Sequence, residues 1–305
     1  MKPSVPERAS SALRDFAARG EMIDYDGHRV FVIDDASRAK SPDARAVVFI
    51  HGFPGSAFDF GGMFDRVGEH RRVVALDLLG FGLSDKPTEM GLSLFEHADL
   101  VEVVLRRLGI RSCVLVAHDM GTTVALELCT RRRLGLLSFE IGGVLFTNGS
   151  VFIELSQLTP SQKLLRVPVV GPVFARAARF ATFRAQINRI SGRRLSDEAL
   201  RDMFELMVAS GGREVLPKLI GYVSERYRFA ERWVGHLDRV DIPTSVVWGG
   251  RDPVAIPPIG ERLARALPDA HFVRLEDVGH FSPLEAPAEL SAEVLALAAR
   301  ADAAP

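Results

Sequence analysis

The fold is decided by the stretch Val116-Ala117-His118-Asp119-Met120-Gly121-Thr122, in which an apolar run ends at a carboxylate and a glycine follows two residues later. The run Ser112–Asp119 is continuous rather than alternating, which is typical of a strand covered on both faces. Thr122–Thr130 then has helical spacing, so strand passes into helix within a few residues. A turn this sharp presents one side chain, Asp119, at the end of the strand. Capping of the helix is the alternative role for this aspartate.

Similar apolar runs recur along the chain and alternate with helical patterns, which predicts an α/β fold with a mostly parallel central sheet. An opening hairpin is expected at Glu21–Asp34, with Asp26-Gly27 at its turn. The helical pattern Leu94–Leu108 ends at Gly109. The other buried strands are expected at Ala46–His51, Arg72–Leu78, Gly143–Asn148, Thr244–Gly249 and Phe272–Leu275.

The strand pattern disappears between residues 151 and 240, where the sequence is helical throughout. This block predicts a helical cap inserted into a core made of residues 1–150 and 241–305. Ligands bind at the carboxyl ends of the strands in such sheets, so the cap is expected to cover the site. The cap holds 15 Lys and Arg against 9 Asp and Glu. That excess would favour anionic substrates, but solvated helix faces against an acidic core are the more ordinary interpretation.

The composition narrows the classes of function. The 305 residues carry a formal net charge of −1, which gives no global field for nucleic acid or an anionic membrane surface. Neither a signal peptide nor a membrane span is expected, so a cytoplasmic location is predicted. Cys113 and Cys129 lie in apolar stretches and are expected to be buried free thiols. Neither metal-ligand spacing nor a phosphate-binding loop is found, and we predict no metal and no cofactor.

Two more polar side chains are expected at the same edge of the sheet as Asp119. Asp252 comes just after the strand Thr244–Gly249, and His280 lies in the loop after the last strand. The chain order is therefore nucleophile, acid, histidine, each at the carboxyl end of a strand. One such residue alone is more often structural, but three in this order favour a catalytic triad.

The loop after the first parallel strand reads His51-Gly52-Phe53-Pro54-Gly55. In a strand–nucleophile–helix turn, one backbone N–H from this loop and one from the residue after the nucleophile bind a developing oxyanion. Phe53 and Met120 are the expected donors. His51 is interpreted as a residue that braces the loop rather than as a catalytic base.

These motifs together resemble the epoxide hydrolase and haloalkane dehalogenase branch of the α/β-hydrolase superfamily, which implies an α/β-hydrolase fold with an inserted cap. Within that branch the chain is most similar to the mesoderm-specific-transcript-like group, through Phe146-Thr147-Asn148-Gly149-Ser150 and the segment from Tyr222 to Gly235. The motifs shared with the branch as a whole are HGFPGS at 51–56, DLLGFGLSDKP at 77–87, AHDMGT at 117–122, GGRDPV at 249–254 and DVGHF at 277–281.

The resemblance implies covalent catalysis in two steps. Asp119 attacks a saturated carbon and forms an alkyl-enzyme ester, and His280, oriented by Asp252, activates the water that hydrolyses it. The substrate is then a small apolar epoxide or alkyl halide. Asn148 stands where some relatives place the triad acid, and Glu154 is the reserve candidate for that role.

The leaving group separates the two activities. Dehalogenases have a tryptophan directly after the nucleophile, whereas this chain has Met120, which cannot donate a hydrogen bond. Epoxide hydrolases have acidic tyrosines in the cap, and Tyr222 is the expected one, although packing with its hydroxyl in water is its alternative role. Tyr227 is expected only to pack. The early cap has neither Tyr nor His as a second acid, and Gln157 and Gln186 are its unranked candidates.

Three functions therefore stay open. An epoxide hydrolase is the first prediction, a hydrolytic dehalogenase the second, and a ligand-binding protein that keeps the hydrolase scaffold the third. Phe281, Asn148 and Trp233 are expected at the substrate pocket, although packing where helix and strand meet is the more ordinary role for Trp233. A monomer and a homodimer both remain open, with a small molecule as partner and no nucleic acid or membrane.

Overall fold

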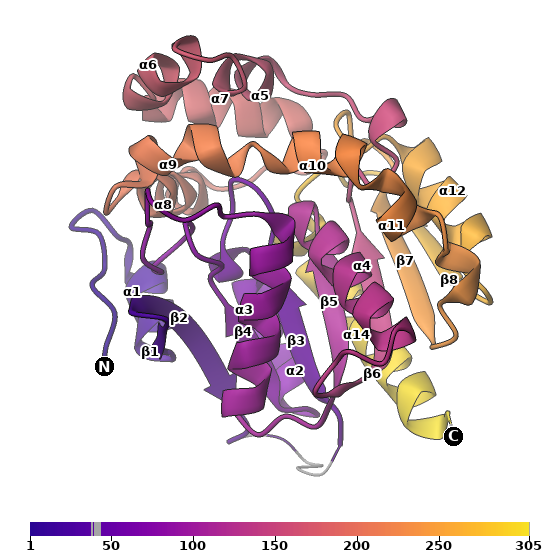
Figure 1. The fold of residues 1–305 in the computed structure, drawn as a ribbon. Helices are drawn as coiled ribbons and strands as arrows, with labels where there is room; N and C mark the ends of the chain where they lie inside the picture. The colour runs from indigo at the N-terminus through magenta and orange to yellow at the C-terminus, as the bar shows by residue number, and fades with distance from the viewer. Residues whose placement is uncertain (38, 40–43, 305) are drawn as a thin grey trace.

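A computed structural model describes residues 1–37, 39 and 44–304 of the chain. Its centre is an eight-stranded sheet of order β1-β2-β4-β3-β5-β6-β7-β8 (Figure 1). The first two pairings, β1 with β2 and β2 with β4, are antiparallel, and all others are parallel. The strands are β1 Glu21–Tyr25, β2 His28–Asp35, β3 Ala46–Ile50, β4 Val73–Leu76, β5 Ser112–His118, β6 Glu140–Thr147, β7 Thr244–Gly249 and β8 His271–Leu275.

The predicted α/β-hydrolase fold is confirmed, and each expected strand is present with its ends shifted by up to three residues. Asp26 and Gly27, which form the hairpin turn, both have positive φ, as a tight two-residue turn requires. The inner strands β3 to β7 are almost wholly buried, because helices cover both faces. The edge strand β8 is only partly buried, so its expected full burial was wrong.

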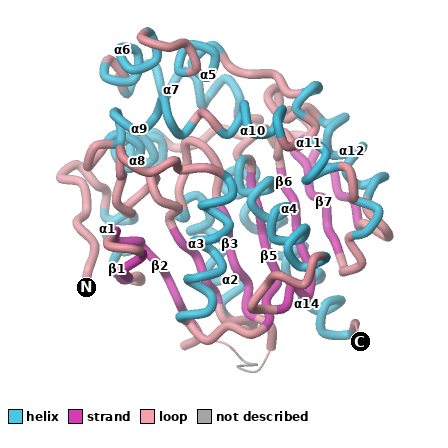
Figure 2. Tube along the Cα trace, in the orientation of Figure 1, coloured by secondary structure: helices cyan, strands magenta, loops and turns pink. Residues whose placement is uncertain are grey.

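Helices cover the sheet in two layers (Figure 2). The layer packed with the larger apolar cluster contains α3 Leu94–Arg107, α4 Met120–Arg133 and α12 Pro257–Ala266. The opposite layer contains α1 Ser11–Ala18, α2 Gly61–Gly68 and α14 Pro287–Ala303. Three 3₁₀ turns, Ala57–Phe60, Ile153–Leu155 and Leu237–Arg239, and the short helix α13 Ser282–Glu285 complete the core and its junctions.

The segment between β6 and β7 is helical, and it crosses the carboxyl ends of the strands (Figure 1). It contains α5 Pro160–Leu165, α6 Val170–Arg176, α7 Phe180–Ile190, α8 Asp197–Val208, α9 Gly212–Leu219, α10 Tyr222–Arg228 and α11 Ala230–Val234. We call it the cap. The domain limits at residues 151 and 240 stay a prediction. The helix α11, which lies inside these limits, packs against α4 of the core.

Candidate active site

The strand β5 lies between β3 and β6 near the middle of the sheet, and it ends directly before Asp119. The helix α4 begins at the next residue, so Asp119 itself makes the turn, with φ of 47° and ψ of −112°. A side chain at Gly121 would place its Cβ 2.3 Å from the carbonyl oxygen of Ile50. The loop and the helix therefore approach each other closely only because residue 121 is glycine. The positive φ of Asp119 is strained for a residue other than glycine, and such strain is typical of functional sites.

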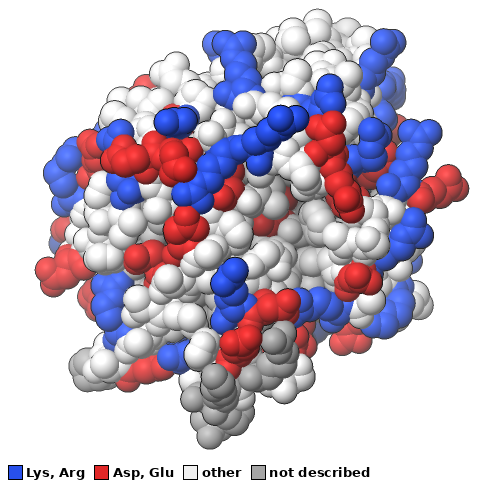
Figure 3. Space-filling view, turned by 180° about the vertical axis from the view of Figure 1, so that it is seen from behind, with Lys and Arg blue, Asp and Glu red and all other residues white. Residues whose placement is uncertain are grey.

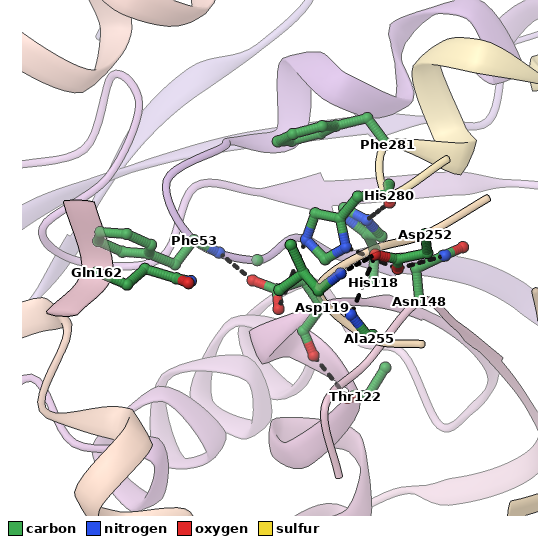
Figure 4. A network of polar contacts seen from close by, with 12 residues as sticks. Phe53, His118, Asp119, Thr122, Asn148, Gln162, Asp252, Ala255, His280 and Phe281 are labelled. Carbon is green, nitrogen blue, oxygen red and sulfur yellow. Dashed lines mark hydrogen bonds and ion pairs between the residues drawn. The ribbon is translucent and has the colours of Figure 1, made fainter. Parts of the chain in front are cut away.

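The Asp119 carboxylate is held between two groups (Figure 4). Its Oδ2 accepts a hydrogen bond of 2.8 Å from the backbone N–H of Phe53. Its Oδ1 lies 4.0 Å from Nε2 of His280. Met120 is the first residue of α4, where the helix offers its N–H no acceptor, but its role as second oxyanion donor remains a prediction.

Asp252 and His280 meet as the sequence predicts, with 2.8 Å between the Asp252 Oδ2 and the His280 Nδ1. The other carboxylate oxygen accepts hydrogen bonds from the backbone N–H groups of Val254 and Ala255. Asn148 supplies a further donor, its Nδ2 lying 2.7 Å from Asp252 Oδ2. Three donors besides the imidazole therefore fix the Asp252 carboxylate against His280.

The charge balance at His280 follows from this arrangement. Burial alone would lower the pKa of its imidazole, but the carboxylates of Asp252 and Asp119 raise that pKa to about 9. The ring is therefore an imidazolium at neutral pH, and its Nε2 faces the Asp119 carboxylate. Any chemistry that removes the negative charge of Asp119 would lower the pKa of His280 and make it a better base.

The His280 loop is tied down from two sides. His118 Nε2 donates to the backbone carbonyl oxygen of His280 at 2.8 Å, and burial lowers the pKa of His118 to about 4, which keeps that ring neutral. The carboxylate of Glu285 accepts from four backbone N–H groups, two in this loop and two in the cap, at Gly279, Phe281, Gly192 and Arg193. The histidine loop and the end of α7 are thus held together.

Tyr222, at the start of α10, is placed over the same site. It is 3% exposed, and its ring lies 5.9 Å from that of Phe53. Burial and the nearby charge of Asp119 both raise the pKa of its hydroxyl, so it stays protonated. Its hydroxyl oxygen accepts from Gln162 Nε2 at 3.3 Å, which leaves the phenolic proton available for a substrate.

Gln162 was not foreseen from the sequence, although its position in the early cap is where a second donor was missing. Its side chain extends toward Asp119 (Figure 4). Its Oε1 accepts from the backbone N–H of Thr159 at 2.8 Å, in a capping box at the start of α5. Because that N–H needs an acceptor, the amide is oriented with its Nε2 toward Tyr222. The sequence signal was the Thr-x-x-Gln spacing before α5.

Arg226 was also missed. It lies one turn after Tyr222 in α10 and is 2% exposed. Its guanidinium donates to the backbone carbonyl oxygen of Asp119 at 2.9 Å and to Thr123 Oγ1 at 2.8 Å. It also lies 4.8 Å from the centre of the Tyr222 ring. This one cation therefore connects the cap helix that carries Tyr222 to the turn that carries Asp119.

Two cavities meet at Phe53, Pro54 and Gln186. The smaller one is bounded by Gln162 and His280, and Phe281 forms part of its wall as predicted. The larger one, of about 140 Å³, extends under the cap and is mainly apolar. Its other walls are Ser161, Leu165, Phe174, Ala175, Ala177, Ala178, Arg179, Thr182, Phe183, Met207 and Leu216.

Several expected pocket residues lie elsewhere. The indole N–H of Trp233 donates to Glu127, and the ring packs on Phe95 and Phe229, so it belongs to the junction of α11 with α4. Asn148 lies behind Asp252 and orients it instead of lining the pocket.

Two candidate polar residues are also displaced from the triad. Glu154 pairs with Arg262 at the surface and cannot be the triad acid. Gln157 is exposed, whereas Gln186 does line both cavities. Within the described residues, no group of three or more His, Cys, Asp or Glu side chains is arranged to hold a metal. In the same part of the chain, no helix is long and apolar enough to cross a membrane.

Residues 47–293 match the model of the alpha/beta hydrolase family. The chain belongs to that family. It is 36% identical over 290 residues to a putative hydrolase, LipZ, of Mycobacterium tuberculosis, covering 94% of this chain and 98% of the relative. It is also 36% identical over 293 residues to the human mesoderm-specific transcript homolog protein, covering 92% and 86% of the two chains. The protein is therefore a hydrolase of this fold.

Solved structures of related fold agree with the architecture. The haloalkane dehalogenase DbeA of Bradyrhizobium elkani superposes with a TM-score of 0.78 over 94% of this chain and 99% of its own, at 22% identity. Identity this low shows the fold alone. A haloalkane dehalogenase of Mesorhizobium japonicum is 35% identical, but over only 128 residues, or 41% of each chain.

Proposed function

We propose that this hydrolase opens a small or medium apolar epoxide to a vicinal diol, without a cofactor. The observation that supports it most is that Phe53 contacts both groups that ring opening needs: its backbone N–H donates to Asp119, and its ring lies 5.9 Å from that of Tyr222. Asp119, held by Phe53, supplies a nucleophile, and the protonated Tyr222 supplies an acid with a free proton. An epoxide needs both at once, because its oxygen leaves as an alkoxide.

In the first step, the Asp119 carboxylate forms a bond to one epoxide carbon as the carbon–oxygen bond of the ring breaks. The Tyr222 hydroxyl gives its proton to the leaving oxygen, and the product is a hydroxyalkyl ester. The ester carries no charge, so the pKa of His280 falls from its value of about 9 in the free enzyme. The imidazolium proton then returns through water to the tyrosinate.

In the second step, the neutral His280 takes a proton from water, and the hydroxide attacks the ester carbonyl. The N–H groups of Phe53 and Met120 bind the oxyanion that forms. Collapse of this intermediate releases the diol and restores the Asp119 carboxylate, which again faces an imidazolium. Asp252 keeps the imidazole in place and stabilises its charged form.

Gln162 supports the same assignment. With its oxygen fixed by Thr159, it points an N–H donor at the Tyr222 hydroxyl. A donor there stabilises the tyrosinate that forms during ring opening, and it also offers the leaving oxygen a second hydrogen bond. Gln162 thus fills the place for which the sequence offered Gln157 and Gln186.

A dehalogenase is the second candidate, and the placement of N–H donors counts against it. A halide leaves as an anion and needs donors, of which indole N–H groups are the usual source. Both tryptophans are committed elsewhere, Trp233 to Glu127 and Trp248 to the carbonyl oxygen of Ala255. Met120 brings no side-chain donor, so only Gln162 and Tyr222 remain near the nucleophile.

Intact-protein mass spectrometry of the His280→Gln variant, exposed to a panel of epoxides and haloalkanes, tests this proposal. Without the base, the ester on Asp119 should accumulate. An adduct with the whole mass of an epoxide supports the proposal, and an alkyl adduct with halide release would replace it with dehalogenation. The matched control is Asp119→Asn with His280→Gln, which should form neither adduct.

Absence of any adduct from folded His280→Gln protein would overturn the covalent mechanism and favour the binding-protein alternative. The site would then be a pocket for an apolar ligand on a hydrolase scaffold. A cytoplasmic location and a homodimer remain proposals, since neither follows from the site. The expectation of no membrane partner rested on the net charge and on the lack of an apolar stretch long enough to span a membrane.

A further inference from the structure

The outermost part of the cap carries an unusual concentration of exposed apolar side chains. Among the described residues, nine large apolar side chains are exposed, and five of them lie within residues 164–173. We call residues 163–179, which span the end of α5, the whole of α6 and the loop after it, the cap tip. The five are Leu164, Val167, Val169, Val170 and Val173, exposed by 41%, 43%, 81%, 45% and 64%.

Neither packing nor backbone geometry accounts for this surface. Val169 has a φ of 67°, a conformation that favours glycine or asparagine and strains a β-branched residue. It is nonetheless a valine that is 81% exposed. An apolar patch of this kind on a protein surface marks an interaction site.

The charged residues in the stretch of sequence that contains the patch are all of one sign. Residues 155–196 contain eight Lys and Arg and neither Asp nor Glu. Of these, Lys163, Arg176 and Arg179 lie in the cap tip with exposed side chains and have no carboxylate partner in the described part of the chain. Figure 3 shows the top of the molecule as a crest of white atoms with blue atoms on both sides. The net charge of −1 hides this local asymmetry.

The patch lies on the outer side of an apolar cavity next to the site. Leu165, Phe174, Ala175, Ala177, Ala178 and Arg179 belong to the cap tip and also line the 140 Å³ apolar cavity. That cavity shares Phe53, Pro54 and Gln186 with the smaller cavity that reaches His280. The exposed face of α5 and α6 and the wall of the cavity are therefore two sides of the same short segment.

We propose that the cap tip docks on an anionic lipid bilayer, from which apolar substrates enter the cavity beneath it. Exposed valines and leucine would insert among the lipid headgroups, while the surrounding Lys and Arg contact phosphate groups. This is contact with a membrane surface and requires no spanning helix. A second copy of the chain fits less well, because a two-fold contact would bring identical basic tips together.

Cosedimentation with vesicles tests the proposal, using phosphatidylcholine vesicles with about one-third phosphatidylglycerol and pure phosphatidylcholine vesicles. The wild-type chain should bind the anionic vesicles, and more weakly as salt is raised. Val169→Asp with Val173→Asp should lower the partition coefficient about tenfold or more. These two residues do not line the cavity, so turnover of a water-soluble epoxide should be unchanged.

The matched control is Leu134→Asp with Leu136→Asp, an exposed apolar pair after α4 on the core. It should bind anionic vesicles like the wild type. Equal loss of vesicle binding in the two double variants, or no vesicle binding by the wild type, would overturn the proposal. If the tip variant instead converts a dimer to a monomer by light scattering, the patch is an interface between copies. The vesicle and light-scattering measurements do not need turnover, so the docking proposal and the proposed reaction can fail separately.

Discussion

Removal of one hydroxyl group, in Tyr222→Phe, is the most direct test of the ring-opening step. The ring is buried beside Phe53, and Arg226 lies 4.8 Å from its centre, contacts that a phenylalanine keeps. The fold should therefore survive the change. The same helix offers a matched control, Tyr227→Phe, at a tyrosine that is 57% exposed.

The magnitude follows from the environment of the hydroxyl. Burial and the charge of Asp119 raise the pKa of Tyr222, so the acid is present at every useful pH. A positioned general acid contributes roughly 10²–10⁴ in rate. The Gln162 N–H remains in the variant and replaces part of the lost stabilisation. We therefore expect the lower end, a loss of about 100-fold, which corresponds to about 3 kcal/mol.

The assay measures the rate of ester formation on Asp119 by quenched mass spectrometry in the His280→Gln background, which isolates the first step. Tyr222→Phe should slow epoxide addition, while Tyr227→Phe should leave it unchanged. Any haloalkane adduct should slow less than the epoxide adduct, because a halide leaves without a proton and the Gln162 donor remains. Equal rates of epoxide addition in the two tyrosine variants would refute the assignment of Tyr222 as the acid.

Three further predictions concern the carboxylates. Asp252→Asn should slow ester hydrolysis and accumulate the adduct, whereas Glu154→Gln should behave as wild type in the same mass assay. Asp119→Asn should lower the pKa of His280, by at most about 3 units for charges 4.0 Å apart, as NMR titration of the imidazole would show. Burial raises the pKa of Asp59 to about 8, so its ionisation opposes folding as pH rises from about 4 toward 8. Asp59→Asn should therefore stabilise the protein more at pH 8 than at pH 5 in urea unfolding, and a difference independent of pH would contradict this.

The parts of the fold that the sequence predicts are those determined by local pattern. A strand buried on both faces needs a continuous apolar run, and Ser112–His118 and Thr244–Gly249 have one. Asp119 follows its run directly and Asp252 comes three residues after the end of its run, so their positions at one edge of the sheet follow from parallel pairing. The helix α1 has no such context, and it was not foreseen because its burial depends on packing against β2 and α2.

The residues that were missed or misplaced are those whose roles depend on distant partners. Trp233 is as apolar as a pocket residue, but its N–H finds Glu127 on α4, 106 residues earlier. Asn148 ends a strand at the expected edge, yet the direction of its amide is set by Asp252. Arginine is usually a surface residue. Arg226 is buried only because α10 packs against the turn at Asp119. Sequence spacing does not encode any of these contacts.

The net charge of the chain also differs from the charge of its individual segments. Summed over the chain, Lys and Arg nearly cancel Asp and Glu, and this predicts no attraction to an anionic surface. Electrostatic attraction is nevertheless screened over about 8–10 Å at physiological salt, so only charges near the contact count. The acid-free stretch 155–196 supplies the tip itself, so the sequence places its Lys and Arg next to that contact. We therefore expect the charge of the cap tip, and not the net charge of the chain, to determine whether this hydrolase binds a membrane surface.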